Sequence, residues 1–94
     1  MPFVGYSIFD IHVQNVHSLK EKRFVVRSVK DRIAQKFNVA VSETGHLDKW
    51  QRCELSVASV AGERRSVERT LEGIRSLLDG EPELRVISDE TEIL

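Results

Sequence analysis

The most regular pattern of hydrophobic and polar positions lies in the segment Ser18–Phe37. Placing its residues at about 100° per position gathers six apolar side chains into one stripe, which predicts an amphipathic helix. The stripe consists of Leu19, Val25, Val26, Val29, Ile33 and Phe37. Ser18 is followed three residues later by Glu21, and this capping box predicts that the helix begins at Ser18. One face of the helix must therefore be buried against the rest of the chain.

The segment Phe3–Val13 alternates its side chains and is rich in β-branched and aromatic residues, which is typical of a strand. Asp10 and His12 share one side, so we expect the other side to face the core. The residues expected in the core are Phe9, Ile11 and Val13. The side of Asp10 and His12 is then the open face, and it still carries Val4, Tyr6 and Ile8.

The remainder of the chain predicts a hairpin, a second helix and a last strand. In order these are strands Asn38–Glu43 and Trp50–Val60 around the loop Thr44–Lys49, a helix Glu63–Leu78 and a short strand Leu84–Ser88. Gly73 weakens the second helix, since glycine costs about 1 kcal/mol relative to alanine. An acidic tail follows the last strand.

This succession is strand, helix, strand, strand, helix, strand. With right-handed crossovers and a central hairpin it folds most simply into an α+β ferredoxin-like sandwich (βαββαβ), a four-stranded antiparallel sheet with two helices on one face. The alternative is a swapped or split arrangement of the same elements. The chain has 94 residues, which suits a single domain spanning 1–94.

The formal charge of −1 hides a strong segregation of charge along the chain. Ser18–Phe37 holds seven basic and two acidic residues, whereas Asp79–Leu94 holds six acidic residues and one basic residue. Within the first helix a second stripe, turned away from the apolar one, is basic. It consists of Lys20, Arg23, Arg27 and Lys30, with Phe24 beside it.

The basic stripe predicts contact with phosphates, and Phe24 offers a stacking surface. The alternative is a solvated helix face in which Arg27 pairs with Asp31, or in which the acidic tail is the partner. The open sheet face lacks the aromatic pair of an RNA-recognition motif, so we expect RNA to contact the helix or the loops. Val4, Tyr6 and Ile8, with Ala58 and Val60 beside them, permit a homodimer instead.

The hairpin loop and the start of the strand after it have an unusual polar content. His46, Asp48, Trp50, Gln51 and Arg52 offer a small recognition site there. We expect Trp50 to cover the end of the sheet and Arg52 to make contacts outside the fold.

No catalytic or metal-binding motif is evident. His12, His17 and His46 have no metal-ligand spacing, and no nucleophile motif accompanies Asp10 and His12. Cys53 alternates inward and is expected in the core. We therefore predict a protein that is not an enzyme and holds no metal or small-molecule cofactor.

The lone cysteine excludes an intramolecular disulfide framework and suits a reducing, cytoplasmic location. No run of residues is long and apolar enough for a membrane span, and the N-terminus has no basic leader or cleavable hydrophobic segment. We therefore expect no membrane partner.

Two motifs point to a known family. His17–Arg23 reads H-S-L-K-E-K-R, with K-F-N-V following at Lys36–Val39, and Glu43–Arg52 reads E-x-G-x-x-D-x-W-Q-R. Together they resemble the YlxP-like family of small bacterial proteins, a domain of unknown function numbered 503. The resemblance covers nearly the whole chain. It departs at Phe24, where another basic residue is frequent, and at Cys53, where a small apolar residue is frequent.

The resemblance implies a ferredoxin-like fold and a bacterial cytoplasmic protein. It also implies genes that often lie beside those for translation initiation and ribosome-binding factors, an association that supplies no mechanism. The motif residues are Ser18, Lys20, Glu21, Lys22 and Arg23 in the first, and Asp48, Trp50, Gln51 and Arg52 in the second. With the basic helix, this predicts a module that binds RNA or a ribosomal component. The predicted contact residues are Lys20, Lys22, Arg23, Arg27, Lys30, Gln51 and Arg52.

Overall fold

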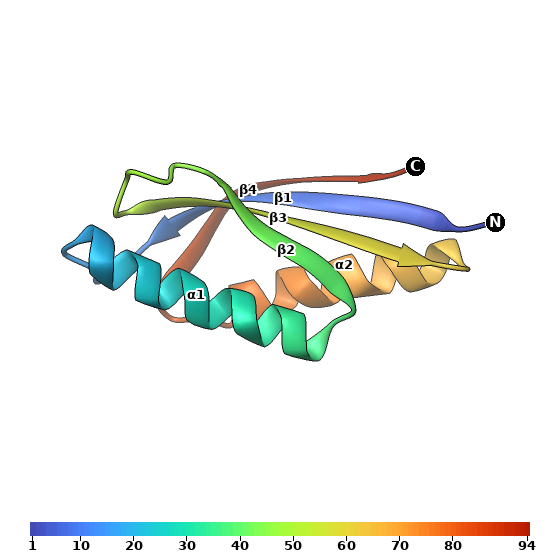
Figure 1. Cartoon of the computed structure of the whole chain (residues 1–94), viewed down its shortest axis with the longest axis horizontal. Helices are drawn as coiled ribbons and strands as arrows, with labels where there is room; N and C mark the ends of the chain where they lie inside the picture. Colours follow the sequence, from blue (N-terminus) through green and yellow to red (C-terminus); the bar gives the residue numbers. More distant parts are fainter.

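The computed structural model describes all of residues 1–94, as two helices and four strands (Figure 1). In chain order these are β1 (Phe3–Val13), α1 (Leu19–Lys36), β2 (Val39–Gly45), β3 (Arg52–Ala61), α2 (Arg64–Asp79) and β4 (Leu84–Ile93). This order confirms the predicted succession of elements. Both helices begin and end within one residue of the predicted boundaries.

The strands form one sheet in the order β2-β3-β1-β4, in which all neighbours are antiparallel. The central strand β1 pairs with β3 from Phe3↔Ala61 to His12↔Arg52, and with β4 on its other side. Both helices cover the same face of the sheet and leave the other face open (Figure 1). The arrangement is the ferredoxin-like sandwich that the sequence predicts.

The two helices lie toward opposite ends of the long axis of the molecule (Figure 1). The molecule is elongated, with principal extents of 45 × 20 × 17 Å. Helix α1 packs mainly beneath β2, whereas α2 packs beneath β1, β3 and β4. Neither helix combines the length and the apolar character that crossing a lipid bilayer would require.

The core lies between the sheet and the helices, and it confirms the predicted inward faces of β1 and β3. Its principal side chains are Phe9, Ile11 and Val13 from β1, Cys53, Leu55 and Val57 from β3, Val26, Val29 and Ile33 from α1, and Val67, Leu71, Ile74 and Leu78 from α2. Full burial of one large apolar side chain stabilises a fold by about 1.5–3 kcal/mol. Burial also raises the pKa of the Cys53 thiol to about 12, so the thiol stays protonated and unreactive in the folded protein.

Helix α1 begins at the predicted cap. Ser18 Oγ accepts a hydrogen bond from the backbone N–H of Glu21 at 3.1 Å, and it lies 3.3 Å from Glu21 Oε2. At the other end the chain leaves the helix at Phe37, whose N–H donates to the carbonyl of Ile33 at 2.9 Å. The cap at Ser18 therefore fixes where the helix starts. Because the helix ends before Phe37, the Phe37 ring packs against α2.

The last strand differs from the prediction, because β4 continues to Ile93 instead of ending at Ser88. The segment expected to be an acidic tail pairs with β1 as far as Gly5↔Ile93. Polar partners on the inner face stabilise this extension, since Thr91 Oγ1 lies 2.6 Å from Ser7 Oγ and Asp89 accepts from Arg75 at 2.7 Å. The acidic residues thus belong to an edge strand.

Gly73 in the middle of α2 is explained by the Phe37 ring. A Cβ atom at Gly73 would lie 2.8 Å from Phe37 Cε1, closer than carbon atoms approach one another. The missing side chain therefore allows the end of α1 to rest on α2, and the cost in helix propensity is offset by this close packing.

We expect the effect of Gly73→Ala to depend on Phe37. In the native background, alanine stabilises the helix through its higher helix propensity but destabilises the protein by overpacking against the Phe37 ring. In a Phe37→Leu background the overpacking is relieved. The substitution should therefore be more favourable by about 1–2 kcal/mol beside leucine. Urea unfolding of the four proteins measures this coupling. Equal effects in both backgrounds would show that the ring does not require glycine.

Candidate nucleic-acid interface

The predicted basic stripe on α1 is present and free of ion pairs. Lys20, Arg23 and Arg27 are exposed, while Lys30 is half-buried at the margin of the stripe. None of the four forms an ion pair, and the Arg27–Asp31 pair that the spacing permits is not formed. The exposed charges are therefore available to an external anion. We call Lys20, Arg23 and Arg27 the basic flank.

The basic flank lies away from the acidic strand β4. Arg32, on the opposite flank of α1, pairs with Glu81 in the turn between α2 and β4. A helix advances roughly 100° per residue, so Arg23 and Arg27 lie roughly 140–180° around the axis from Arg32. The basic flank therefore faces the β2 side of the molecule, whereas β4 forms the other edge of the sheet.

Two of the three acidic residues of β4 have partners outside α1. Asp89 pairs with Arg75 at 2.7 Å, and Glu92 accepts a hydrogen bond from the Tyr6 hydroxyl at 2.7 Å. That hydrogen bond, together with the negative charge of Glu92, raises the pKa of Tyr6. No carboxylate of β4 pairs with α1, so the alternative in which the acidic tail neutralises the basic stripe does not occur.

Phe24 projects from α1 beside the basic flank, and its side chain is 75 % exposed. A shallow apolar hollow next to it is lined by Lys20, Glu21 and Val25. An exposed ring next to cations is the combination on which unpaired bases stack in single-stranded RNA complexes. Phe24 therefore places an exposed aromatic ring beside the basic flank.

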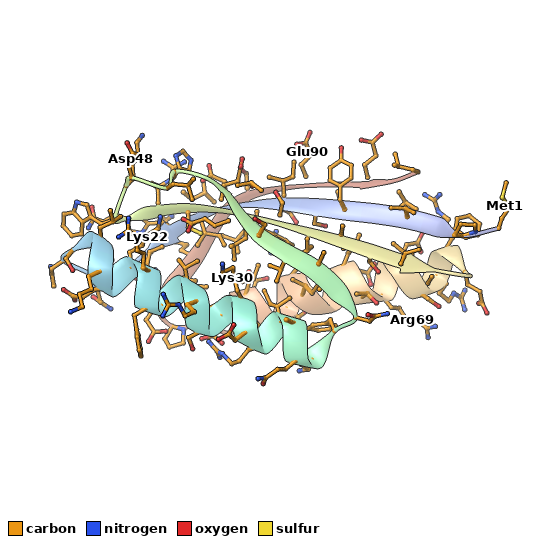
Figure 2. The ribbon with its side chains drawn as sticks, in the orientation of Figure 1. Met1, Lys22, Lys30, Asp48, Arg69 and Glu90 are labelled. Carbon is orange, nitrogen blue, oxygen red and sulfur yellow. The ribbon has the colours of Figure 1, made fainter.

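Lys22 is not part of this surface. Its side chain is fully buried, and its Nζ atom donates to Glu43 Oε2 at 2.5 Å and to the backbone carbonyl of His46 at 3.0 Å. Figure 2 shows Lys22 directed from α1 toward the sheet. The prediction that Lys22 contacts RNA is therefore wrong. The spacing in the sequence already indicates that Lys22 is buried. Lys22 precedes the buried residues Val26 and Val29 by one and two helical turns, so it lies in the apolar stripe.

The structure brings the two sequence motifs together. The backbone of His46 has a left-handed φ of 57°, and its carbonyl accepts from Lys22. The Trp50 ring lies 6.4 Å from the His17 ring, measured between centroids and inclined at 47°. The loop between β2 and β3 therefore rests against the N-terminal end of α1. Trp50 lies at this junction, whereas the sequence predicts that it covers the end of the sheet.

Arg52 lies on the open face of the sheet, across from the helices. It makes a bidentate pair with Asp10, in which Nη2 donates to Oδ2 at 2.7 Å and Nε donates to Oδ1 at 3.3 Å. His46 Nε2 lies 3.6 Å from the same carboxylate. The charge of Arg52 is thus matched within the fold, and neither Arg52 nor the adjacent Gln51 joins the basic flank. Arg52 points outward as predicted, but its partner Asp10 is not evident from the sequence.

The residues considered for catalysis are only partly assembled. Asp10 and His46 line a polar hollow of about 480 Å³ on the open face, together with Glu54 and Glu90. His12 is not in this hollow, and its Nδ1 is buried without a hydrogen-bond partner. No group of three or more His, Cys, Asp or Glu side chains is arranged to hold a metal ion. The absence of enzyme activity stays a prediction.

The fold and the site together define a small ferredoxin-like domain with a cationic helix flank. The chain belongs to the family described as "Protein of unknown function (DUF503)", whose model matches residues 4–91. It is 34 % identical over 89 residues to the "Uncharacterized protein YlxP" of Bacillus subtilis, covering 95 % of this chain and 97 % of that protein. The resemblance found in the two motifs is thereby confirmed.

A solved structure is similar only in outline. SnoaB, a cofactor-independent oxygenase from Streptomyces nogalater, superposes with a TM-score of 0.45 and 13 % sequence identity, covering 99 % of this chain and 90 % of that chain. At this level of similarity, the oxygenase tells us nothing about function here.

We expect Lys22→Met to destabilise the protein by about 3 kcal/mol, because Glu43 and the His46 carbonyl lose their buried donor. Adding Glu43→Gln should recover part of this loss, since the unpaired carboxylate is then removed. The control is Lys20→Met on the exposed flank, which should change stability by less than about 0.5 kcal/mol. Chemical denaturation of the native protein and these three variants measures their free energies of unfolding. Equal small effects of Lys22→Met and Lys20→Met would contradict the buried pair.

Proposed function

We propose that the protein is a non-enzymatic module that binds RNA through the basic flank of α1. The observation that carries the proposal is the presence of three exposed cations without ion pairs on one side of a single helix. Lys20 and Arg27 are separated by two helical turns, about 10 Å along the axis at 1.5 Å per residue. Cations at this spacing suit a phosphate backbone, whose charges repeat along its length.

Two further features favour RNA over another polyanion. Phe24 supplies an aromatic face next to the cations, which single-stranded bases require and an acidic protein surface does not. The acidic strand β4 lies at the far edge of the sheet, so the field of the protein orients the basic flank toward a polyanion.

The ribosome is the proposed location of this RNA. The support comes from the YlxP-like resemblance, with its gene neighbours in translation initiation and ribosome binding, and that support is associational. A ribosomal partner would place the protein in the cytoplasm, where the buried Cys53 thiol remains reduced.

A homodimeric scaffold is the second candidate, and an apolar groove on the open sheet face favours it. The groove has a volume of about 310 Å³, and its lining includes Tyr6, Ile8, Ala40 and Ala58. Val4 and Val60 are exposed on the same face. A second copy placed face to face would bury this apolar surface around a two-fold axis.

The RNA proposal predicts that Lys20→Gln, Arg23→Gln and Arg27→Gln together weaken binding and flatten its salt dependence. Loss of three phosphate contacts should reduce the slope of log affinity against log salt by about 2 for a single strand. Fluorescence anisotropy with a labelled single-stranded RNA of mixed sequence, over a salt series, measures both quantities. Phe24→Ala should weaken binding with the slope unchanged.

The matched control for this experiment replaces Arg65, Arg69 and Arg85 by glutamine. All three are exposed and outside any ion pair, so the net charge changes equally while the basic flank is intact. The control should retain most of the native affinity. Equal loss in both triple variants would reduce the interaction to overall charge and remove the assigned interface.

The scaffold candidate predicts that Ala58→Glu, in the apolar groove, converts a dimer into a monomer. Burial of an unpaired charge opposes association of two apolar faces. Sedimentation equilibrium of the native protein and the variant measures this, and Ala34→Glu on the exposed side of α1 is the control. A native protein that sediments as a monomer over the whole concentration range eliminates the scaffold.

A further inference from the structure

The outer edge of β4 has no strand partner, because β4 ends the sheet order next to β1. In an antiparallel ladder, successive residues direct their backbone groups to opposite sides of the strand. Leu94 N–H donates to the Val4 carbonyl at 2.8 Å, and by alternation Glu92 and Glu90 also face β1. The backbone groups that point outward, with no strand to receive them, belong to Asp89, Thr91 and Ile93.

A groove runs beneath this free edge, between β4 and α2. Its volume is about 360 Å³, and the side chains of Asp89, Thr91 and Ile93 line it together with the apolar residues Phe9 and Leu71. The residues with free backbone groups therefore also direct their side chains into the groove. A strand added to this edge would place every second side chain in the groove.

Carboxylates flank the edge on both faces of the sheet. Glu72 of α2 lies along the groove, and neither it nor the open-face residues Glu90 and Glu92 forms an ion pair. Figure 2 shows Glu90 directed away from the helices. Asp89 is already matched by Arg75. An added strand would therefore meet unpaired negative charge with either set of its side chains.

We propose that the free edge of β4 binds an extended, lysine- or arginine-bearing segment of a partner protein by strand addition. The three outward-facing residues supply the hydrogen bonds, the groove accepts alternate side chains, and Glu72, Glu90 and Glu92 select cations. A second copy of β4 does not fit, because its own glutamates would face these. This site is separate from the basic flank of α1 and does not rest on RNA binding.

Hydrogen exchange tests the geometry directly. The probe is a short labelled peptide that alternates lysine and valine, added to the full-length protein. Exchange of the amide protons of Asp89, Thr91 and Ile93 should slow by about tenfold or more at saturation, because each N–H gains an acceptor. Amide protons of β2, the other edge, should be unaffected. Peptide binding that leaves all three protons unprotected would overturn strand addition.

A pair of variants at Thr91 separates strand addition from simple attraction. Thr91→Pro removes an outward N–H that β1 does not use, whereas Thr91→Val keeps the N–H and loses the same hydroxyl contact with Ser7. The affinity for the peptide should fall about tenfold with proline and by less than about twofold with valine. Unchanged affinity with Thr91→Pro, in a protein whose β1 and β4 remain paired by NMR, would refute the site.

The charge requirement is tested by Glu90→Gln against Asp31→Asn. Both remove one exposed carboxylate, but Asp31 lies on α1. Glu90→Gln should weaken the peptide about threefold to tenfold, and Asp31→Asn should have no effect. A matched peptide that alternates glutamate and valine should not bind. Equal effects of the two variants would show attraction by net charge alone and overturn the proposal.

Discussion

The buried pair between Lys22 and Glu43 is the interaction on which the placement of α1, and with it the basic flank, depends. Lys22 belongs to the basic segment, but its charge is buried inside the fold. Its Nζ atom donates hydrogen bonds to both the Glu43 carboxylate and the His46 carbonyl. Burial of such a pair costs desolvation energy, which offsets much of the attraction between the charges. Its contribution is therefore to select one arrangement of the elements more than to add to the stability of the fold. The pair joins α1, β2 and the loop after β2 at one point.

The same pair also fixes the rotation of α1. A shift of α1 by one residue would turn it by about 100° and place either Glu21 or Arg23 where Lys22 is buried. With Glu21 there, two carboxylates would face each other without a cation. With Arg23 there, Arg27 and Lys30 would be buried without partners in the places of Val26 and Val29. Because both shifts are costly, the orientation that buries Val26, Val29 and Ile33 is also the one that presents Lys20, Arg23 and Arg27 to solvent. The buried pair and the apolar stripe together thus determine which cations are free.

Much of the fold follows from sequence, because local patterns and tertiary needs agree there. The strand alternation around Phe9 and Leu55, and the cap at Ser18, each specify their structure locally. The β4 extension could not be found in this way. Its inner residues Asp89 and Thr91 are polar, and their partners Arg75 and Ser7 come from distant parts of the chain. Side chains alternate between the two faces along this part of β4, but the inward-facing ones are polar, so no hydrophobic pattern indicates a strand.

The candidate site was predicted less completely, for a related reason. The stripe of cations was visible from helical spacing, but the sequence does not show which cations have partners. Arg52 meets Asp10 through the register of β1 and β3, and Lys22 meets Glu43 through the packing of α1 on β2. Gly73 is a comparable case, because its unfavourable helix propensity is explained only by contact with the Phe37 ring at the end of α1. In each case the missing information is a contact between remote residues.

The basic flank lies on α1 beneath the edge strand β2, and the free acidic edge is β4 at the other side of the sheet. This separation sets how the two charged surfaces influence each other. Four strands spaced about 4.8 Å apart place β2 and β4 about 14 Å from one another. The Debye length is about 8 Å at physiological ionic strength, so direct attraction between ligands on the two edges is largely screened. At low salt the screening length exceeds this distance, and a cationic segment on β4 would then strengthen the attraction of the basic flank for a polyanion. The domain therefore combines two nearly independent surfaces at physiological salt, which allows opposite charges to coexist without cancelling on a small protein whose net charge is only −1.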